Sequence, residues 1–124
     1  MNIPDNLFYT KEHEWINVDG DIATVGITDF AQKELGDIVF VEVETLDEEL
    51  EIEETFGTIE AVKTVSDMFM PISGTVSELN GALEDEPETI NRDPYGEGWI
   101  IKIKMSDLSQ VNDLLSAEAY KELI

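Results

Sequence analysis

Short runs in which apolar and polar residues alternate restrict the folds open to this chain more than any other feature. Residues 101–105 have the sequence Ile-Lys-Ile-Lys-Met, and residues 41–44 have Val-Glu-Val-Glu. An alternation of period two places every second side chain on the same face of a β-strand. Turn signals separate such runs, as Asp-Gly does at 19–20 and Ser-Gly at 73–74. Short strands joined by short turns predict a mainly β protein, an antiparallel sandwich or barrel.

Helical signals are few. Asp29 and Gln32 have the spacing of a capping box, and Gly36 suits the position after a helix end, so we expect one short helix between them. Apolar residues at helical spacing predict a second helix that begins near Ser109 and restarts after Ser116. The chain should therefore contain short helices and end in a helical segment.

Two stretches are mainly acidic. Residues 47–54 contain Leu50 and Ile52 in alternation, which favours a solvated edge strand over a disordered segment. Residues 84–88 are expected to form a surface loop, and Pro87 is suited to begin a very short helix.

Length and composition exclude several classes of protein. A chain of 124 residues predicts one domain, and the absence of cysteine excludes disulfides, thiolate metal sites and cysteine nucleophiles. The formal charge of −22 argues against binding to nucleic acids or anionic membranes. It could steer encounters with basic partner surfaces or serve solubility alone. The N-terminus lacks the features of a signal or transit peptide, so we expect a cytoplasmic protein.

Classical catalytic constellations are weakly supported. His13 is the only histidine, and a hydrogen-bonded structural role is a better interpretation than a metal ligand or an acid–base group. We therefore expect no metal site and no catalytic residue. Residues 93–99 suit a turn before the strand at 101–105, and Trp99 and Trp15 suit the core.

Lys63 is the residue that best suits a functional role. Two β-prone runs of similar length, 55–62 and 64–71, flank this single lysine, as they would at the tip of a hairpin. An amine at such a tip can be acylated and serve as the root of a swinging prosthetic arm. An ordinary solvated turn lysine is the alternative. Val62-Lys63 is a poor centre for a type I′ turn, so the flanking strands must hold the hairpin.

Several segments together resemble one known family. Residues 59–67 have the sequence Ile-Glu-Ala-Val-Lys-Thr-Val-Ser-Asp, and Pro-Ile-Ser-Gly follows at 71–74. These motifs closely resemble the lipoyl-lysine segment of the glycine cleavage system H proteins. The resemblance extends to residues 9–15, to 23–37 and to 91–99, and it covers nearly the whole chain.

The resemblance implies a barrel-sandwich hybrid in a single lipoyl-carrier domain over residues 1–124. It implies that Lys63 is exposed at a hairpin and carries lipoate through an amide bond. The chain itself would be a non-catalytic carrier and, we expect, a monomer. Its arm would take a glycine-derived aminomethyl group from a pyridoxal-phosphate glycine decarboxylase to a tetrahydrofolate-dependent aminomethyltransferase. A flavin- and NAD-dependent dihydrolipoyl dehydrogenase would then reoxidise the arm, and a separate lipoyl-attaching enzyme would install it.

The resemblance also suggests roles for three carboxylates. Glu14 and Asp67 would hold the cationic aminomethyl arm in a sheltering cleft, with solvation or turn capping as the plain alternative. Glu60, three residues before the lysine, would belong to the surface that the lipoylating enzyme reads.

Some residues depart from the family pattern. Ala61 stands where many members have serine, and Glu12 adds negative charge near the proposed cleft. Asp47 and Glu53 stand where the family often has glycine, which raises the question of a left-handed backbone there.

Three other functions remain open. One is a lipoyl-relay protein that hands lipoate to other carriers, and another is an unmodified acidic interaction module of the same fold. A biotin carrier is less well supported, because such proteins usually place methionine beside the target lysine, where Val62 and Thr64 stand here.

Overall fold

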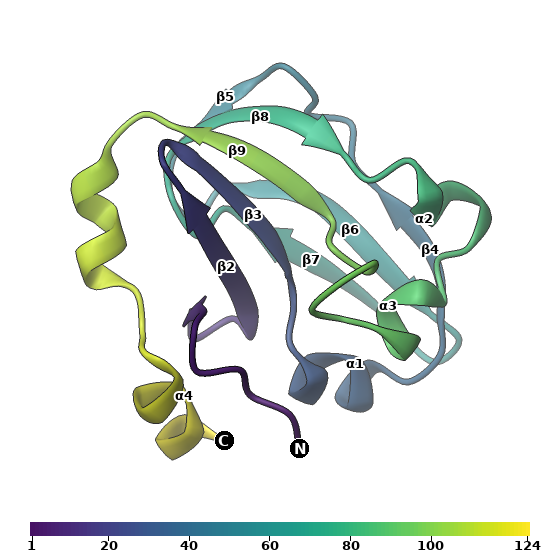
Figure 1. Ribbon diagram of the computed structural model, residues 1–124. Coiled ribbons are helices and arrows are strands. Elements are labelled where there is room, and N and C mark those ends of the chain that lie inside the picture. The colour runs from purple at the N-terminus through teal and green to yellow at the C-terminus, as the bar shows by residue number, and fades with distance from the viewer.

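The computed structural model describes all 124 residues and consists of two antiparallel β-sheets with short helices around them (Figure 1). The larger sheet has six strands in the order β1-β2-β3-β9-β8-β5. Their bounds are Phe8–Tyr9 for β1, Glu14–Asp19 for β2, Ile22–Ile27 for β3, Ile101–Met105 for β9, Gly74–Leu79 for β8 and Glu49–Leu50 for β5. The smaller sheet has the order β4-β6-β7. Its strands are Ile38–Glu42, Thr55–Ala61 and Val65–Phe69.

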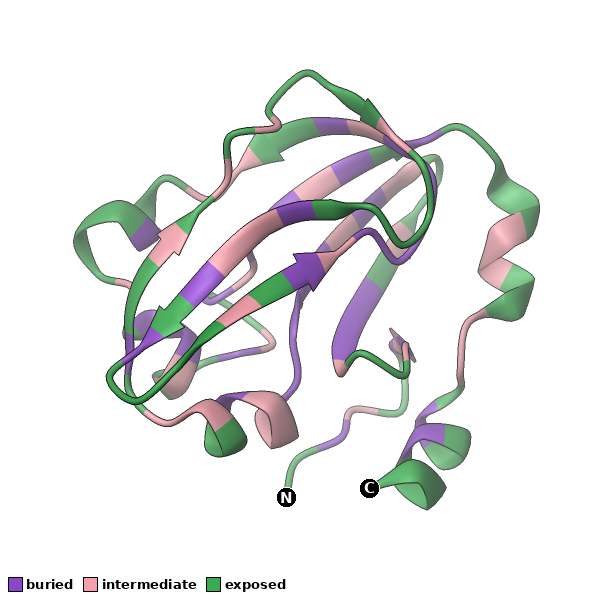
Figure 2. Cartoon of the chain, turned by 180° about the vertical axis from the view of Figure 1, so that it is seen from behind, coloured by how far each residue is buried: buried purple, intermediate pink, exposed green.

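The two sheets enclose one main core of 18 buried residues to which both contribute, for example Val25 and Ile103 from one sheet and Ile59 and Met68 from the other. Burial alternates most regularly in β9, where Ile101, Ile103 and Met105 are buried and Lys102 and Lys104 are not, as the period-two pattern predicts. Other strands contain consecutive buried or consecutive exposed residues (Figure 2). The arrangement is the one expected of a mainly β barrel-sandwich hybrid. A second cluster of six buried residues joins the two ends of the chain, and Tyr9 stacks on Tyr120 within it with ring centroids 4.8 Å apart.

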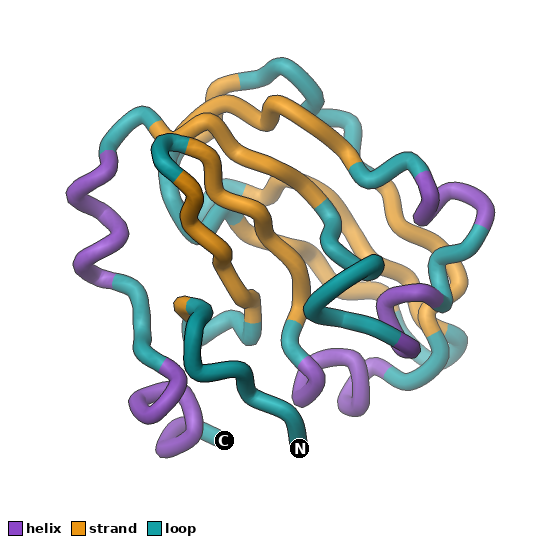
Figure 3. The backbone as a smooth tube through the Cα atoms, viewed as in Figure 1, coloured by secondary structure: helices purple, strands orange, loops and turns teal.

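The helical segments lie outside the sheets (Figure 3). They are α1 at Asp29–Leu35, α2 at Ala82–Asp85, α3 at Thr89–Arg92, the 3₁₀ helix η1 at Leu108–Asp113 and α4 at Ala117–Leu123. None has the length or the apolar character that crossing a bilayer requires.

The predicted helix at 29–36 is confirmed, but its predicted cap is wrong. Thr28 is the N-cap: its Oγ1 accepts a hydrogen bond from Ala31 N at 3.2 Å. The Gln32 amide donates to the Asp29 carboxylate at 2.8 Å instead of closing a capping box. Gly36 ends the helix with a φ of 81°, as expected.

Other elements differ in extent from their predictions. The segment that begins near Ser109 is a 3₁₀ helix, while the restart after Ser116 is the α-helix α4, capped by the Ser116 side chain. Residues 84–88 are not simply a loop, because α2 runs to Asp85 and α3 begins only at Thr89, two residues after Pro87. The strand expected at 47–54 is an edge strand as predicted but spans only two residues.

Candidate functional site

Lys63 lies in the loop that joins β6 and β7, at the exposed end of the smaller sheet (Figure 2). The last register pair before the loop joins Glu60 to Val65. Ala61 N then donates to Thr64 O at 2.8 Å and closes the loop. Only Val62 and Lys63 lie between these two bonded residues, so the flanking strands hold a tight loop around the lysine, as the sequence predicts.

The segment that follows α1 supports the Lys63 loop. Val62 N donates to Asp37 O at 3.1 Å, which ties the loop to the chain that leaves α1. A Cβ built on Gly36 would lie 3.5 Å from Lys63 Cε, so the lysine side chain extends over the C-terminal end of α1. The three ion pairs of the molecule do not involve Lys63. Its amine is exposed and without a carboxylate partner.

A cavity of about 330 Å³ opens next to this end of α1. We call it the α1–β7 cavity, because one wall is α1 and another is β7, with residues 12–14 between them. Half of its lining is hydrophobic, and its other residues include four carboxylates. The hydrophobic lining residues are Ile27, Phe30, Ala31, Leu35, Ile59 and Met68, and the carboxylates are Glu12, Glu14, Glu34 and Asp67. The space combines an apolar wall with negative charge.

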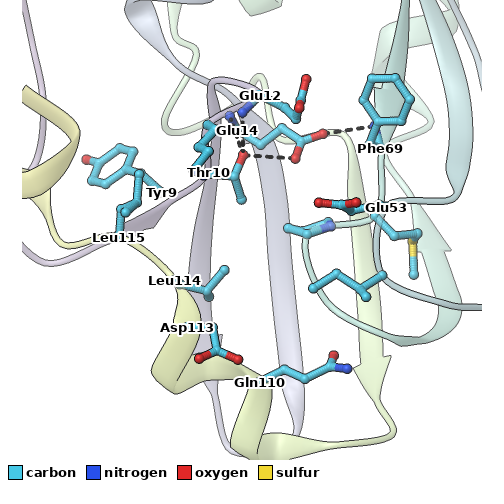
Figure 4. A pocket seen from close by; sticks show the side chains of 14 residues that line it. Tyr9, Thr10, Glu12, Glu14, Glu53, Phe69, Gln110, Asp113, Leu114 and Leu115 are labelled. Carbon is cyan, nitrogen blue, oxygen red and sulfur yellow. Dashed lines mark hydrogen bonds between the residues drawn. The ribbon is translucent and has the colours of Figure 1, made fainter. Parts of the chain in front are cut away.

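Glu14 is the buried carboxyl of this cavity, with only 3% of its surface exposed. Its Oε2 accepts a hydrogen bond from Phe69 N in β7 at 3.0 Å, and its Oε1 accepts one from the Thr10 hydroxyl at 3.1 Å (Figure 4). The side chain thus links β2 in one sheet to the edge of the other. Burial raises the pKa of Glu14 from 4.5 to about 8, because water no longer solvates the carboxylate and no cation replaces it.

A second cavity, of about 260 Å³, lies on the other side of Glu14. Figure 4 shows it between β7, η1 and the chain near Thr10, with Glu53, Gln110 and Asp113 on its walls. Glu12 and Glu14 line both cavities, so the hydrogen-bonded Glu14 carboxyl stands between them. No sequence pattern indicates that Glu14 separates two cavities, because this depends on where β2 and β7 meet.

Asp67 and Glu60 occupy exposed positions. Asp67 pairs with Thr58 and lies between partly buried Ser66 and buried Met68, which places it at the rim of the α1–β7 cavity and not at its base with Glu14. Glu60 is exposed on the same strand as buried Ile59, on the outer face of the smaller sheet. The structure therefore brings Asp67 and Glu14 to one cavity at different depths, and keeps Glu60 outside it.

His13 has the hydrogen-bonded position that the sequence predicts. Its Nδ1 is 2.8 Å from the Tyr120 hydroxyl, which in turn is 2.8 Å from Thr28 Oγ1. The His13 ring lies 4.7 Å from the ring of Phe30 in α1, and burial lowers its pKa below the usual 6.5. Tyr120 thus ties α4 to the wall of the cavity. The sequence offers no signal for this contact, which joins residues 107 positions apart.

Three residues other than glycine have a left-handed backbone: His13, with a φ of 66°, and two residues at which the chain departs from the family pattern. Asp47 and Glu53 have φ values of 70° and 72°, in the left-handed region that favours glycine. Glu53 N donates to Met70 O at 2.8 Å, so its conformation is fixed by a hydrogen bond at the end of β7. The left-handed backbone that the sequence raised as a question is present at both residues.

Known proteins resemble this chain over nearly all of its length. The family model described as "Glycine cleavage H-protein" matches residues 7–124. The glycine cleavage system H protein of Bacteroides thetaiotaomicron is 63% identical over 124 residues, covering 100% of this chain and 98% of that protein. That of Staphylococcus carnosus is 53% identical over 124 residues, with the same coverage.

A solved structure agrees with the fold. The crystal structure of a glycine cleavage system H protein from Mycobacterium marinum superposes with a TM-score of 0.88 at 40% sequence identity, covering 97% of each chain. Sequence and fold agree from end to end, and this chain belongs to the glycine cleavage H-protein family.

Proposed function

We propose that Lys63 carries lipoate as an amide on its Nζ and that the chain is the lipoyl carrier of a glycine cleavage system. One observation carries the proposal: in a member of this family, the lysine of the family's motif is exposed, unpaired and held at a hairpin tip beside a half-apolar cavity. Amidation removes the lysine charge, so the arm can enter an apolar space without desolvating an ammonium. Bound lipoate would supply a disulfide whose sulfur atoms accept and release the carried group.

The α1–β7 cavity fits such an arm chemically. Its apolar residues suit a hydrocarbon chain with a sulfur ring, and its carboxylates suit the aminomethyl cargo, which is cationic near neutral pH. We assign Glu14 to the base of this cavity as the group that receives the ammonium, and Asp67 to the rim. An ammonium beside Glu14 would lower the pKa of its carboxyl and favour the charged form. The cavity walls would keep water from the labile cargo.

In this proposal the chain is a single lipoyl-carrier domain, monomeric and cytoplasmic, and it performs no catalysis of its own. A pyridoxal-phosphate glycine decarboxylase, a tetrahydrofolate-dependent aminomethyltransferase and a dihydrolipoyl dehydrogenase act on the arm in turn. A lipoyl-attaching enzyme installs it, and Glu60 belongs to the surface that this enzyme reads.

A label-transfer experiment tests the proposal. The protein is loaded with lipoate and incubated with glycine decarboxylase and glycine labelled at its methylene carbon, with a known H protein as positive control. We expect label on the protein and none on Lys63→Arg. Failure to acquire label while the control succeeds would contradict the role in glycine cleavage. Transfer of lipoate from the chain to an apo carrier, in a parallel assay, would indicate a relay function.

A further inference from the structure

The hydroxyl of Tyr120 contacts two walls of the α1–β7 cavity, although α4, which carries it, does not line that cavity. Tyr120 is fully buried, and its hydroxyl oxygen lies 2.8 Å from His13 Nδ1 and 2.8 Å from Thr28 Oγ1. His13 lines the cavity, and Thr28 caps α1, which forms another wall. Helices α1 and α4 lie at the same end of the molecule (Figure 1). One hydroxyl from the C-terminal helix therefore joins two walls of the cavity.

The hydroxyl hydrogens of Thr28 and Tyr120 have one arrangement in which both find an acceptor. Thr28 Oγ1 accepts from Ala31 N at 3.2 Å, and its own hydrogen can go to the Tyr120 oxygen. The Tyr120 hydroxyl then donates to His13 Nδ1, so a neutral His13 carries its ring proton on Nε2. In the reverse direction the Thr28 hydrogen would lose this acceptor, and Thr28 is fully buried. Leaving a buried hydroxyl unpaired is costly, which favours the first arrangement.

His13 connects this contact to the segment that carries Glu14. The His13 backbone is left-handed, with a φ of 66°, and such a backbone persists only where surrounding contacts hold it. His13 N donates to Thr10 O at 3.1 Å, and His13 O accepts from Thr28 N at 3.0 Å. The Thr10 hydroxyl in turn donates to the Glu14 carboxyl at 3.1 Å. The position of His13 therefore bears directly on that of the next residue, Glu14.

Aromatic packing extends the contact to the apolar wall of the cavity. The His13 ring lies 5.7 Å from the Tyr120 ring, edge-on, and 4.7 Å from the ring of Phe30. Phe30 belongs to α1 and lines the cavity. The three rings form a row from α4 to α1 with His13 in the middle. A displaced His13 ring would also leave the Phe30 wall without its support.

We propose that Tyr120 is a positioning residue for retention of the carried aminomethyl group: its hydroxyl fixes His13 and the start of α1 so that the α1–β7 cavity encloses the cargo. The inference rests on the proposed function, since the cavity has cargo to retain only if Lys63 carries the arm. Tyr120 acts through His13 and Thr28 and does not touch the arm. The C-terminal helix thereby takes part in the carrier function from outside the cavity.

Loss of the cargo is the reaction that closed cavity walls would slow. Water reacts at the methylene carbon, the carbon–sulfur and carbon–nitrogen bonds break, and the aminomethyl group leaves as formaldehyde and ammonia. The sulfur of the arm takes up a proton and becomes a thiol. Water is the only co-reactant, and no oxidation or reduction takes place. The rate of loss therefore measures how well the cavity excludes water.

Two tyrosine variants form a matched pair for the test. Tyr9 and Tyr120 are both fully buried and stack with ring centroids 4.8 Å apart, and the Tyr9 hydroxyl donates to Pro4 O at 2.6 Å. Tyr120→Phe and Tyr9→Phe each remove one hydrogen-bonded hydroxyl from the same cluster and keep the stacked ring. Only the first removes a contact to the walls of the α1–β7 cavity.

The rate of cargo loss is the first measurement. Each lipoylated variant is loaded with glycine labelled at its methylene carbon and separated from the decarboxylase, and release of labelled formaldehyde is followed. We expect Tyr120→Phe to lose its cargo at least about fivefold faster than wild type, and Tyr9→Phe to stay within about twofold of it.

A second measurement uses the chain without lipoate. Because His13 is the only histidine, the nitrogen chemical shifts of its imidazole can be assigned without ambiguity. We expect the Nδ1 resonance to shift in Tyr120→Phe, which lacks the donor, and to keep its wild-type position in Tyr9→Phe. Hydrogen exchange at the His13 and Thr28 amides should be at least about fivefold faster in Tyr120→Phe only.

The outcomes separate positioning from general loosening. Circular dichroism establishes that each variant is folded, and if Tyr120→Phe is not, His13→Asn replaces it in the cargo assay, since asparagine tolerates the left-handed backbone but lacks the ring. Cargo loss at the wild-type rate, equal acceleration in both tyrosine variants, or an unchanged Nδ1 resonance in Tyr120→Phe would overturn the proposal. If the wild type accepted no cargo while a known H protein did, the proposed function would fail. The imidazole shifts would then show separately whether Tyr120 holds His13.

Discussion

Glu14 is a single carboxyl that connects the two sheets at their open edge, and it does so without a cation beside it. Its oxygens accept from the Thr10 hydroxyl and from Phe69 N, which the ionised form does at least as well as the neutral one. Burial nevertheless dominates and raises its pKa to about 8. The folded protein therefore keeps a proton on Glu14 over a pH range in which the unfolded chain has lost it.

This difference predicts how stability depends on pH. Between pH 4.5 and about 8 the folded state binds more protons at Glu14 than the unfolded state does, so its contribution to the free energy of unfolding falls as pH rises. The fall is at most about 1.4 kcal/mol per pH unit. Urea unfolding of wild type and Glu14→Gln over this range measures it. Subtracting the free energies of unfolding of the two proteins removes the contributions of the other carboxylates. With rising pH, this difference should change steadily in favour of Glu14→Gln.

A fixed cost of Glu14→Gln is also expected, because the new side-chain amide would turn its N–H₂ group toward a hydrogen-bond donor. That cost does not depend on pH, so only the slope tests the prediction. A constant difference between the two proteins from pH 5 to about 8 would show that Glu14 titrates near its ordinary value.

Residue-level inference from the sequence predicts the position of Lys63 in a turn but gives no sign of the contacts of Tyr120. Lys63 is one of seven basic residues, and local β-prone runs place it at a turn without any tertiary information. The contact of Tyr120 with His13 and Thr28 depends on how the C-terminal helix packs 92 or more residues away. Glu14 can be suggested by family resemblance, but its place between two cavities depends on Phe69, 55 residues further along.

At the scale of the elements, the turn before β6 stores strain at Glu53. A glutamate with a φ of 72° is less favourable there than asparagine, whose short side chain tolerates the left-handed region. Glu53→Asn should raise the free energy of unfolding by about 0.5–1 kcal/mol. Glu53→Gln removes the same charge but keeps the long side chain, so it is the control. A chemical denaturation series in which both variants behave alike would contradict the role of the backbone.

The N-terminus of α1 depends on Thr28. Its hydroxyl caps the helix through Ala31 N and also contacts the Tyr120 hydroxyl. Thr28→Val keeps the shape but loses both interactions, and we expect a loss of about 1–2 kcal/mol in unfolding free energy. Thr28→Ser keeps the hydroxyl and should lose less. Thermal or urea unfolding measures both, and an equal loss in the two variants would point to packing of the methyl group instead.

Local sequence predicts these elements unevenly for a physical reason. Period-two alternation identifies β9, because each residue's face follows from its place in the strand. It does not fix the cap of α1, since Thr28 and Asp29 are both good capping residues and the contact with Tyr120 holds Thr28 in place. Residues 108–113 form a 3₁₀ helix although their apolar spacing suits an α-helix, and short segments of this kind are decided by packing.

At the scale of the whole molecule, 29 acidic and seven basic residues give a charge of −22 that must repel itself. The Debye length falls from about 30 Å at 0.01 M salt to about 8 Å at 0.15 M. We therefore expect urea unfolding to show a higher free energy of unfolding as NaCl rises over this range, with little further change above it. Stability that is constant or falls with added salt would contradict net self-repulsion.

The packing of the two sheets against each other also determines features of the site that the sequence alone does not reveal. The chain's motifs locate the lysine and the family, yet the two cavities exist only because the start of β2, in the larger sheet, approaches β7, an edge strand of the smaller sheet, at Glu14. The exposure of both Val39 and Phe40 likewise depends on the register shift in β4, which alternation in the sequence does not contain. Pairing between distant strands sets both features.

Peptide mapping by mass spectrometry of the chain produced with its lipoyl-attaching enzyme tests the central claim most directly. The account predicts a lipoyl adduct on the peptide that contains Lys63 and on no peptide that contains another lysine. It also predicts that Lys63→Arg abolishes the adduct while the protein stays folded. An adduct on a different lysine, or none on Lys63 under conditions that fully modify a known H protein, would contradict it.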